Sequence, residues 1–159
     1  YLGREYMYYG RWNESIDTLL KHIHLETSTW KEERSASMRF IARCYRELNR
    51  IEEAKYWLHR AIKESPNQRE GYVELAFINY TEQEYFSVIE NLLKAKSILK
   101  NEMIYINEPF CWDETIDDIL SLSYYHLGMK DLALYHVNKA LEFSPSDERL
   151  QKNKEIFEK

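Results

Sequence analysis

The densest group of side chains that could do chemistry is acidic and lies at the expected start of a helix. It consists of Asp113, Glu114, Asp117 and Asp118. Asp113 and Asp117 are one helical turn apart, a spacing at which two carboxylates suit a divalent cation. Negative charge in the first turn is also favoured by the helix dipole, and hard-metal sites usually draw ligands from several segments. We therefore interpret the group as helix capping rather than as a metal site.

The histidines do not form a catalytic arrangement with any nucleophile. His22 and His24 are two positions apart on a helix and so point in different directions, while His126 and His136 fall on separate expected helices. The sequence also has no glycine-rich phosphate loop. We therefore expect that this chain by itself is not an enzyme and needs no cofactor. An independent enzyme that uses the acidic group is the alternative.

The composition narrows the class of protein. The 159 residues are 44% hydrophobic and 14% aromatic, which is enough apolar surface to form a folded core. A net charge of −5 argues against general affinity for nucleic acid. Cys44 and Cys111 are solitary, so they signal neither a disulfide framework nor a zinc site. No secretory signal and no apolar stretch of membrane-spanning length is present, so we expect a cytoplasmic protein without a membrane partner.

The elements that carry these residues repeat along the chain. Residues 35–67 read as two amphipathic helices joined by a tight turn and ended by Pro66, with small residues such as Ala42 and Ala61 beside large ones. Small residues allow two helix backbones to approach closely. The same pattern recurs 39 residues earlier, 34 residues later and a further 45 residues later. This predicts an all-α fold, a right-handed α-solenoid of about four helix-turn-helix units in a single domain over 1–159. An unrelated helical bundle with chance periodicity is the alternative.

The units and their ends can be placed approximately. We expect units at about 1–27, 35–67, 69–99 and 113–145, an insertion at 100–112 and a C-terminal capping helix at 146–157. Gly10, Asn49 and Gly128 suit the left-handed backbone at the end of a first helix. The expected N-terminal caps of later helices are Thr29, Asn67 and Ser146.

The insertion adds 11 residues to the 34-residue period and is rich in large apolar side chains. These are Ile104, Tyr105, Ile106, Phe110 and Trp112. Their exposure to water would be costly, so we expect the insertion to fold back on the solenoid. A packed structural connection is the preferred interpretation, and a binding loop is the alternative.

The beginning of the chain indicates a piece of a longer protein. It has no initiator methionine, and Leu2 and Gly3 match Ile41 and Ala42, which lie in the middle of a helix. The first helix would then lack its opening turns, and the exposed apolar surface could lead to self-association.

The first helices of tandem helix pairs line the concave side of a solenoid. Residues at steps of i, i+3, i+7 and i+10 form one row on the face of each first helix. From the earlier to the later helices, these rows change from basic through aromatic to mildly acidic. The arginines would bind carboxylates of an acidic peptide, and the aromatic rings would anchor it. The alternative is a solvated face in which Glu47 pairs with Arg43. The predicted groove residues are Arg4, Met7, Arg39, Arg43, Arg46, Val73, Phe77, Tyr80, Asp118, Leu122 and Tyr125.

These patterns resemble the tetratricopeptide-repeat proteins over nearly the whole chain. More narrowly, the chain resembles the repeat tail of some bacterial family 2-type glycosyltransferases. The phrases that carry this likeness include YLGREYMYYGRWNESI, ARCYRELNRIEEAKYWLHRAI, YINEPFCW and LSYYHLGMKDLALYHVNKALEFSPSDERL. The resemblance implies an upstream domain that binds a nucleotide sugar, with this chain positioning an acceptor protein. The expected function is therefore an interaction module that binds a protein segment, and a free-standing adaptor or peptide sensor is the alternative.

Overall fold

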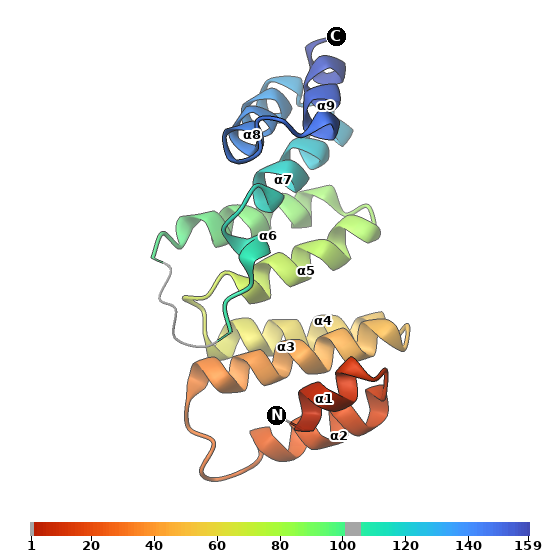
Figure 1. Cartoon of the computed structure of the whole chain (residues 1–159), viewed down its shortest axis with the longest axis vertical. Coiled ribbons are helices and arrows are strands. Elements are labelled where there is room, and N and C mark those ends of the chain that lie inside the picture. The colour runs from red at the N-terminus through yellow and green to blue at the C-terminus, as the bar shows by residue number, and fades with distance from the viewer. Residues whose placement is uncertain (1, 101–105) are drawn as a thin grey trace.

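The computed structural model describes residues 2–100 and 106–159, so Ile104 and Tyr105 of the insertion lie outside the described residues. Within these ranges the chain is helical and contains no strand (Figure 1). The α-helices are α1 (Leu2–Tyr8), α2 (Trp12–Ile23), α3 (Lys31–Glu47), α4 (Ile51–Glu64), α5 (Glu70–Thr81), α6 (Tyr85–Ser97), α7 (Thr115–His126), α8 (Lys130–Phe143) and α9 (Glu148–Glu158). A short 3-10 helix, η1 (Pro109–Cys111), precedes α7.

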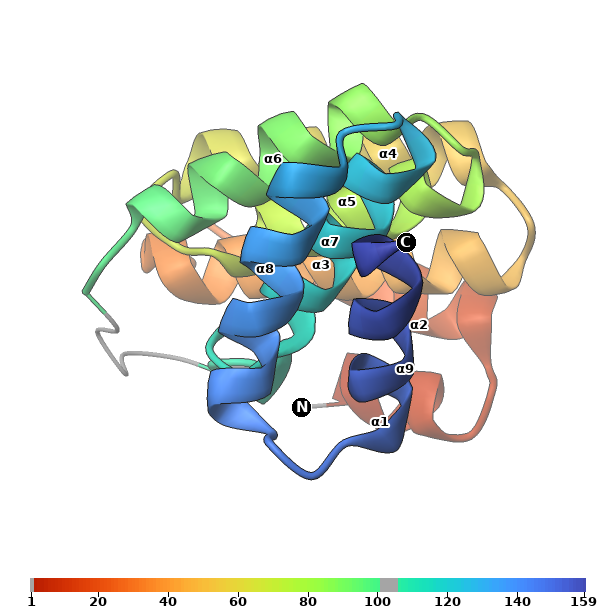
Figure 2. The same ribbon diagram turned by 90° about the horizontal axis from the view of Figure 1, so that it is seen from above.

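The helices form consecutive antiparallel hairpins that stack along the long axis of the molecule. Each helix packs against the next one in the sequence, and α3 also contacts both α1 and α5. Figure 1 shows the stack from the α1–α2 hairpin at one end to α8 and α9 at the other, and Figure 2 views it along its axis from the α8–α9 end. The architecture is an α-solenoid, as the repeat pattern predicted.

The four hairpins share one turn, which explains much of the repeat. The residues Gly10, Asn49, Gln83 and Gly128 have positive φ angles of 71°, 57°, 60° and 76°. In each turn, the backbone N–H of the following residue bonds to a carbonyl five residues before it, for example Arg50 to Tyr45 at 2.8 Å. This satisfies carbonyls that the helix end leaves unpaired. The predictions for the two glycines and Asn49 are confirmed, whereas Gln83 gave no such signal.

Small side chains lie where the helices of a pair approach most closely. Ala42, Ala61 and Ala76 are fully buried or nearly so. Gly3 occupies the place of Ala42 in the first hairpin, and a Cβ atom there would lie 2.7 Å from Leu19 Cγ. A larger residue at these positions must therefore push the helices apart.

The three predicted N-terminal caps are wrong. No side chain caps α3 or α5, so Thr29 and Asn67 do not perform the role expected of them. α9 is capped by Asp147 instead of Ser146, because Asp147 Oδ1 accepts the backbone N–H groups of Arg149 and of the next residue at 2.9 and 3.1 Å. A carboxylate one position later competes well for these donors, since it is charged and favoured by the helix dipole.

The described part of the insertion packs on the solenoid. Ile106 contacts the core of the N-terminal half, while Phe110 and Trp112 contact the core of the C-terminal half. Cys111 is fully buried, and burial raises the pKa of its thiol, so it is held as the neutral form. Ile106, Phe110 and Trp112 are therefore partly covered by the solenoid, in line with the expectation that the insertion folds back, whereas Pro109 is exposed. No helix in the described ranges is both long enough and apolar enough to cross a bilayer.

Candidate functional site

The acidic group at the start of α7 forms contacts within the protein. Asp113 accepts the backbone N–H of Thr115 at 2.9 Å, which is a capping contact. Asp118 pairs with Arg149 of α9, with oxygen–nitrogen distances of 3.1 and 2.5 Å. In the part of the chain that the structure describes, no three His, Cys, Asp or Glu side chains come together to hold a metal ion.

Asp117 is the most enclosed carboxylate of this group. Its Oδ1 atom accepts hydrogen bonds from Lys96 Nζ at 2.6 Å and from His136 Nδ1 at 2.8 Å. Burial by itself raises the pKa of Asp117, but the bonds from His136 and Lys96 more than reverse this and hold the pKa below its ordinary value. The contact ties α6, α7 and α8 together.

We expect Asp117→Asn to lower the free energy of unfolding at neutral pH by about 1–3 kcal/mol, because Lys96 and His136 lose their anionic partner. The pKa of Asp117 is lower in the folded state, so its stabilising effect is present above the ordinary aspartate pKa of about 4 and is lost as the pH falls through the folded value. Urea unfolding at about pH 7 and about pH 3 measures this, and the gap between variant and wild type should shrink in acid. A gap of equal size at both pH values would show that the charge is not the cause.

The predicted arginine stripe meets two carboxylates. Arg39 Nη1 lies 3.1 Å from Glu74 Oε2, and Arg43 Nη2 lies 2.7 Å from Glu108 Oε1. Arg43 also bonds to Glu74 through Nε. Burial by itself lowers the pKa of Arg43, and the two carboxylates raise it above its ordinary value. Two guanidinium groups and two carboxylates thus form a neutral cluster between α3, α5 and the insertion.

Burial corrects the expected open groove at several positions. Arg39 is 1% exposed and Val73 is fully buried, because α3 and α5 are enclosed by their neighbours and by the insertion. Phe77 packs against Phe110 with ring centroids 5.2 Å apart. Tyr125 packs against Phe157 of α9 at 4.7 Å. The middle and C-terminal rows are therefore covered by other parts of the chain.

Four further predicted residues are half-buried. Leu122 and Tyr80 pack against the C-terminal core, and the Tyr80 ring also lies 5.8 Å from that of Tyr85. Asp118 faces α9 through its pair with Arg149. Arg46 lies on α3, partly exposed.

Three predicted residues meet in an open hollow between α1 and α3. These are Arg4, Met7 and Arg43, and the hollow has a volume of about 500 Å³. Its lining also includes Glu5, Tyr8, Trp12 and Glu47.

The hollow combines an apolar wall with two arginines and two glutamates. Its apolar groups are Met7, Tyr8 and Trp12, and Tyr8 is 88% exposed. The guanidinium groups of Arg4 and Arg43 each lie 5.3 Å from the centroid of the Phe40 ring. Cation–π contact of this kind holds a guanidinium in place while leaving N–H donors for a ligand.

Comparison with known proteins identifies the fold. No family model and no curated protein matches the chain. Among solved structures, MamA superimposes with a TM-score of 0.76 at 16% identity, covering 99% of this chain and 82% of MamA. The N-terminal domain of stress-induced protein-1 from C. elegans gives 0.69 at 14% identity, covering 83% of this chain and all of that domain. PilF of Pseudomonas aeruginosa gives 0.70 at 15% identity, covering 95% of this chain and 62% of PilF. The fold is that of the tetratricopeptide-repeat proteins.

At these identities the likeness concerns the tetratricopeptide fold alone. None of the three structures is a glycosyltransferase by name, so the narrower resemblance stays a prediction.

Sequence reasoning missed two kinds of residue in this domain. Trp12 was not among the predicted groove residues, although it opens α2 and lines the hollow. Glu74 and Glu108 lie outside the predicted rows and neutralise the arginines. The available signal was Glu74 itself, an acidic residue within the otherwise apolar run YVELAFINY.

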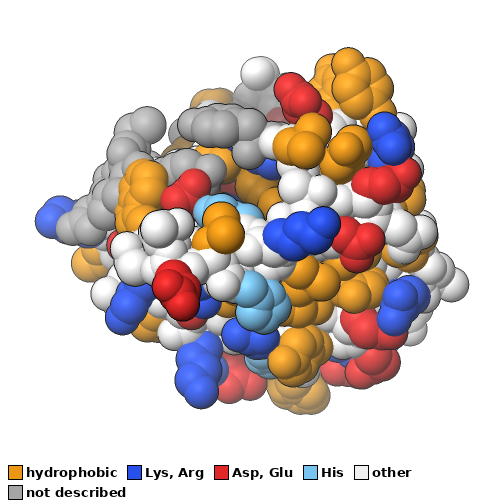
Figure 3. Space-filling model, turned by 90° about the horizontal axis from the view of Figure 1, so that it is seen from below, with side chains coloured by type: hydrophobic (Ala, Val, Ile, Leu, Met, Phe, Trp, Pro, Cys, Tyr) orange, Lys and Arg blue, Asp and Glu red, His pale blue; other side chains and the backbone are white. Residues whose placement is uncertain are grey.

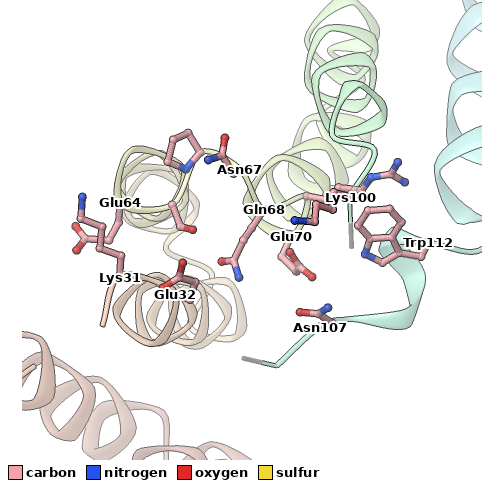
Figure 4. Close-up of a pocket in the computed structure, with 12 residues that line it drawn as sticks. Lys31, Glu32, Glu64, Asn67, Gln68, Glu70, Lys100, Asn107 and Trp112 are labelled. Atoms are coloured by element: carbon pink, nitrogen blue, oxygen red, sulfur yellow. The ribbon is translucent and has the colours of Figure 1, made fainter. Parts of the chain in front are cut away.

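A second, smaller hollow of about 290 Å³ lies at the other end of α3 (Figure 4). It is mostly polar, and Glu70 points into it between Gln68 and Trp112. Glu70 is buried and accepts the backbone N–H of Glu108 at 3.3 Å. The Arg69 guanidinium lies over the Trp112 ring at 3.7 Å. Its lining lacks the apolar wall found between α1 and α3.

Proposed function

We propose that this tetratricopeptide domain is an interaction module that holds a segment of a partner protein on its inner face. By inner face we mean the concave side, which is lined by the first helix of each hairpin. The hollow between α1 and α3 is the observation that carries the proposal. It offers Met7, Tyr8 and Trp12 to an apolar side chain of the partner, with Arg4 and Arg43 at its side. Aromatic and arginine side chains in a partly enclosed hollow are those on which interface energy concentrates.

The charges indicate which segments would bind there. A carboxylate next to the apolar anchor of the partner can pair with the guanidinium of Arg4, which is exposed and rests on Phe40. Glu5 and Glu47 at the rim would disfavour a second carboxylate near them. We therefore expect the partner segment to carry one apolar anchor and one acidic group rather than a long acidic run.

The test uses peptides selected on phage against the chain and then measured by fluorescence anisotropy. Tyr8→Ala should weaken the binding of selected peptides about tenfold, because it removes an exposed ring from the wall of the hollow. Tyr9→Ala is the matched control, since Tyr9 is the next residue, is 77% exposed and is not part of the lining. Equal effects of the two substitutions would place the binding site elsewhere.

The finer proposal, that this domain is the tail of a glycosyltransferase, is supported by the sequence phrases that carry the resemblance. The coding sequence upstream of Tyr1 tests it. A nucleotide-sugar-binding α/β domain with an acidic metal-holding motif would support the tail. A different upstream sequence would favour the free-standing adaptor.

A second copy of the chain is another partner to be tested. Figure 3 views the α1–α2 end, where hydrophobic side chains lie among Lys, Arg, Asp and Glu. Self-association through this end predicts a mass in light scattering that rises above 19.3 kDa with concentration. A constant monomer mass would exclude it as the function of this surface.

A further inference from the structure

The described end of the insertion lies across groups that the sequence predicted to bind a partner. Residues 106–110 pass between α3 and α5 on their way to α7, as the teal segment in Figure 1 shows. Arg39 Nη2 donates to the backbone carbonyl of Ile106 at 3.4 Å, and Glu70 accepts the backbone N–H of Glu108. The chain thus places its own extended segment against its first helices.

The side chains of this segment match the predicted partner in chemistry. Glu108 gives a carboxylate to Arg43 at 2.7 Å and lies 3.6 Å from Arg39. Phe110 gives an aromatic ring to Phe77. Glu108 therefore contacts the basic groups of the inner face, and Phe110, two positions later, contacts its aromatic group.

The contact of Glu108 with Arg43 is less enclosed than Cys111, which follows it in the chain. The side chains of Arg43 and Glu108 are 27% and 18% exposed, and Pro109 is exposed. Cys111 is fully buried, and its carbonyl accepts a hydrogen bond from Arg69 at 2.9 Å. The segment is therefore anchored at Cys111. Within residues 106–110, the pair of Glu108 with Arg43 is partly open to water, whereas Ile106 and Phe110 pack against the solenoid.

Arg43 connects this segment to the open hollow. It lines the hollow between α1 and α3 and also holds Glu108. A partner that enters the hollow and offers a carboxylate to Arg43 therefore competes with Glu108 for the same guanidinium.

We propose that residues 106–110 act as an internal ligand of the inner face, and that the partner segment carries a carboxylate two positions before an aromatic ring. This inference rests on the proposed function and names the chemistry of its partner. The partner replaces Glu108 at Arg43 and Phe110 at Phe77, and continues into the hollow. The internal segment multiplies the apparent affinity for the partner by the fraction of molecules in which the site is free.

The probe is a fluorescein-labelled peptide of residues 106–112, INEPFCW, carrying Cys111→Ser. Glu108→Gln keeps the shape of the internal segment and removes its charge, so the variant should bind the probe at least about tenfold more tightly than the wild type. Glu90→Gln is the matched control, because it removes a carboxylate from an exposed pair with Lys94 far along α6. A second probe with glutamine in place of the glutamate should bind the Glu108→Gln variant poorly.

Hydrogen exchange separates replacement from binding elsewhere. Saturating probe should speed the exchange of the Glu108 backbone N–H in the wild type, since its bond to Glu70 is broken when the segment leaves. The Gln151 backbone N–H in α9 should be unchanged.

Phe110→Ser is a second variant, which removes the ring without changing a charge, and it should also bind the probe more tightly. No gain in either folded variant would overturn the inference, and so would unfolding of both, because residues 106–110 would then be part of the core. The proposed function fails separately, if Tyr8→Ala and Tyr9→Ala affect the selected peptides equally.

Discussion

Replacing Glu74 with glutamine is expected to lower the free energy of unfolding by about 3–5 kcal/mol. Glu74 is buried between Arg39 and Arg43 and is bonded to both. The substitution keeps the shape of the side chain, so no cavity contributes. It leaves the buried guanidinium of Arg39 with Glu108 at 3.6 Å as its remaining acidic neighbour. One carboxylate then faces two guanidinium groups, and an excess buried charge is among the most destabilising changes that a single substitution can cause.

Chemical denaturation of the Glu74→Gln variant measures this loss. Glu90→Gln makes the same chemical change in an exposed pair with Lys94 and should cost less than about 0.5 kcal/mol. If the two variants were equally stable, the cluster between α3, α5 and the insertion would contribute no more than a surface ion pair.

Replacing Ala61 with tryptophan is expected to cost at least about 3 kcal/mol and to lower the melting temperature accordingly. Ala61 is fully buried where α4 faces α3, and its carbonyl accepts the hydroxyl of Ser35 at 2.9 Å. An indole ring at this position must separate the two helices, because native packing leaves no room for it.

Lys63→Trp is the control for this experiment, since Lys63 lies two residues further along α4 and is exposed. Its melting temperature should stay close to that of the wild type. Retention of full stability by Ala61→Trp would contradict the close contact between helices on which the solenoid rests.

The fold could be predicted because its determinants are local and repeat. Gly10, Asn49 and Gly128 mark the same turn in three hairpins, and each has the left-handed backbone expected of it. Small residues such as Ala42 and Ala61 mark the close helix contacts. These features depend on a few neighbouring residues, so one sequence is enough to read them.

The open part of the inner face was less predictable because it depends on contacts between distant segments. Arg39 and Glu108 are brought together by an insertion whose path the repeat pattern does not describe. Phe77 is covered by Phe110 for the same reason. The helical step along α3 and α5 identifies which residues share a face, but it cannot say what else lies on that face.

The N-terminal caps show a different reason for error. Ser146 and Asp147 are both good caps by residue type, and the helix begins so that the aspartate accepts its N–H groups. Local preference thus leaves the starting residue uncertain by one position. The existence of α9 agrees with the predicted C-terminal helix, and Leu150 and Phe157 are its buried residues.

The most direct test of partner binding at the inner face is an NMR titration of the tryptophan indole N–H signals with a selected peptide. The indole of Trp12, which lines the hollow between α1 and α3, should shift strongly on binding. The indole of Trp57 in α4, outside the lining, should not shift. A shift confined to Trp57, with Trp12 unchanged at saturation, would contradict the assignment of the binding site to the inner face.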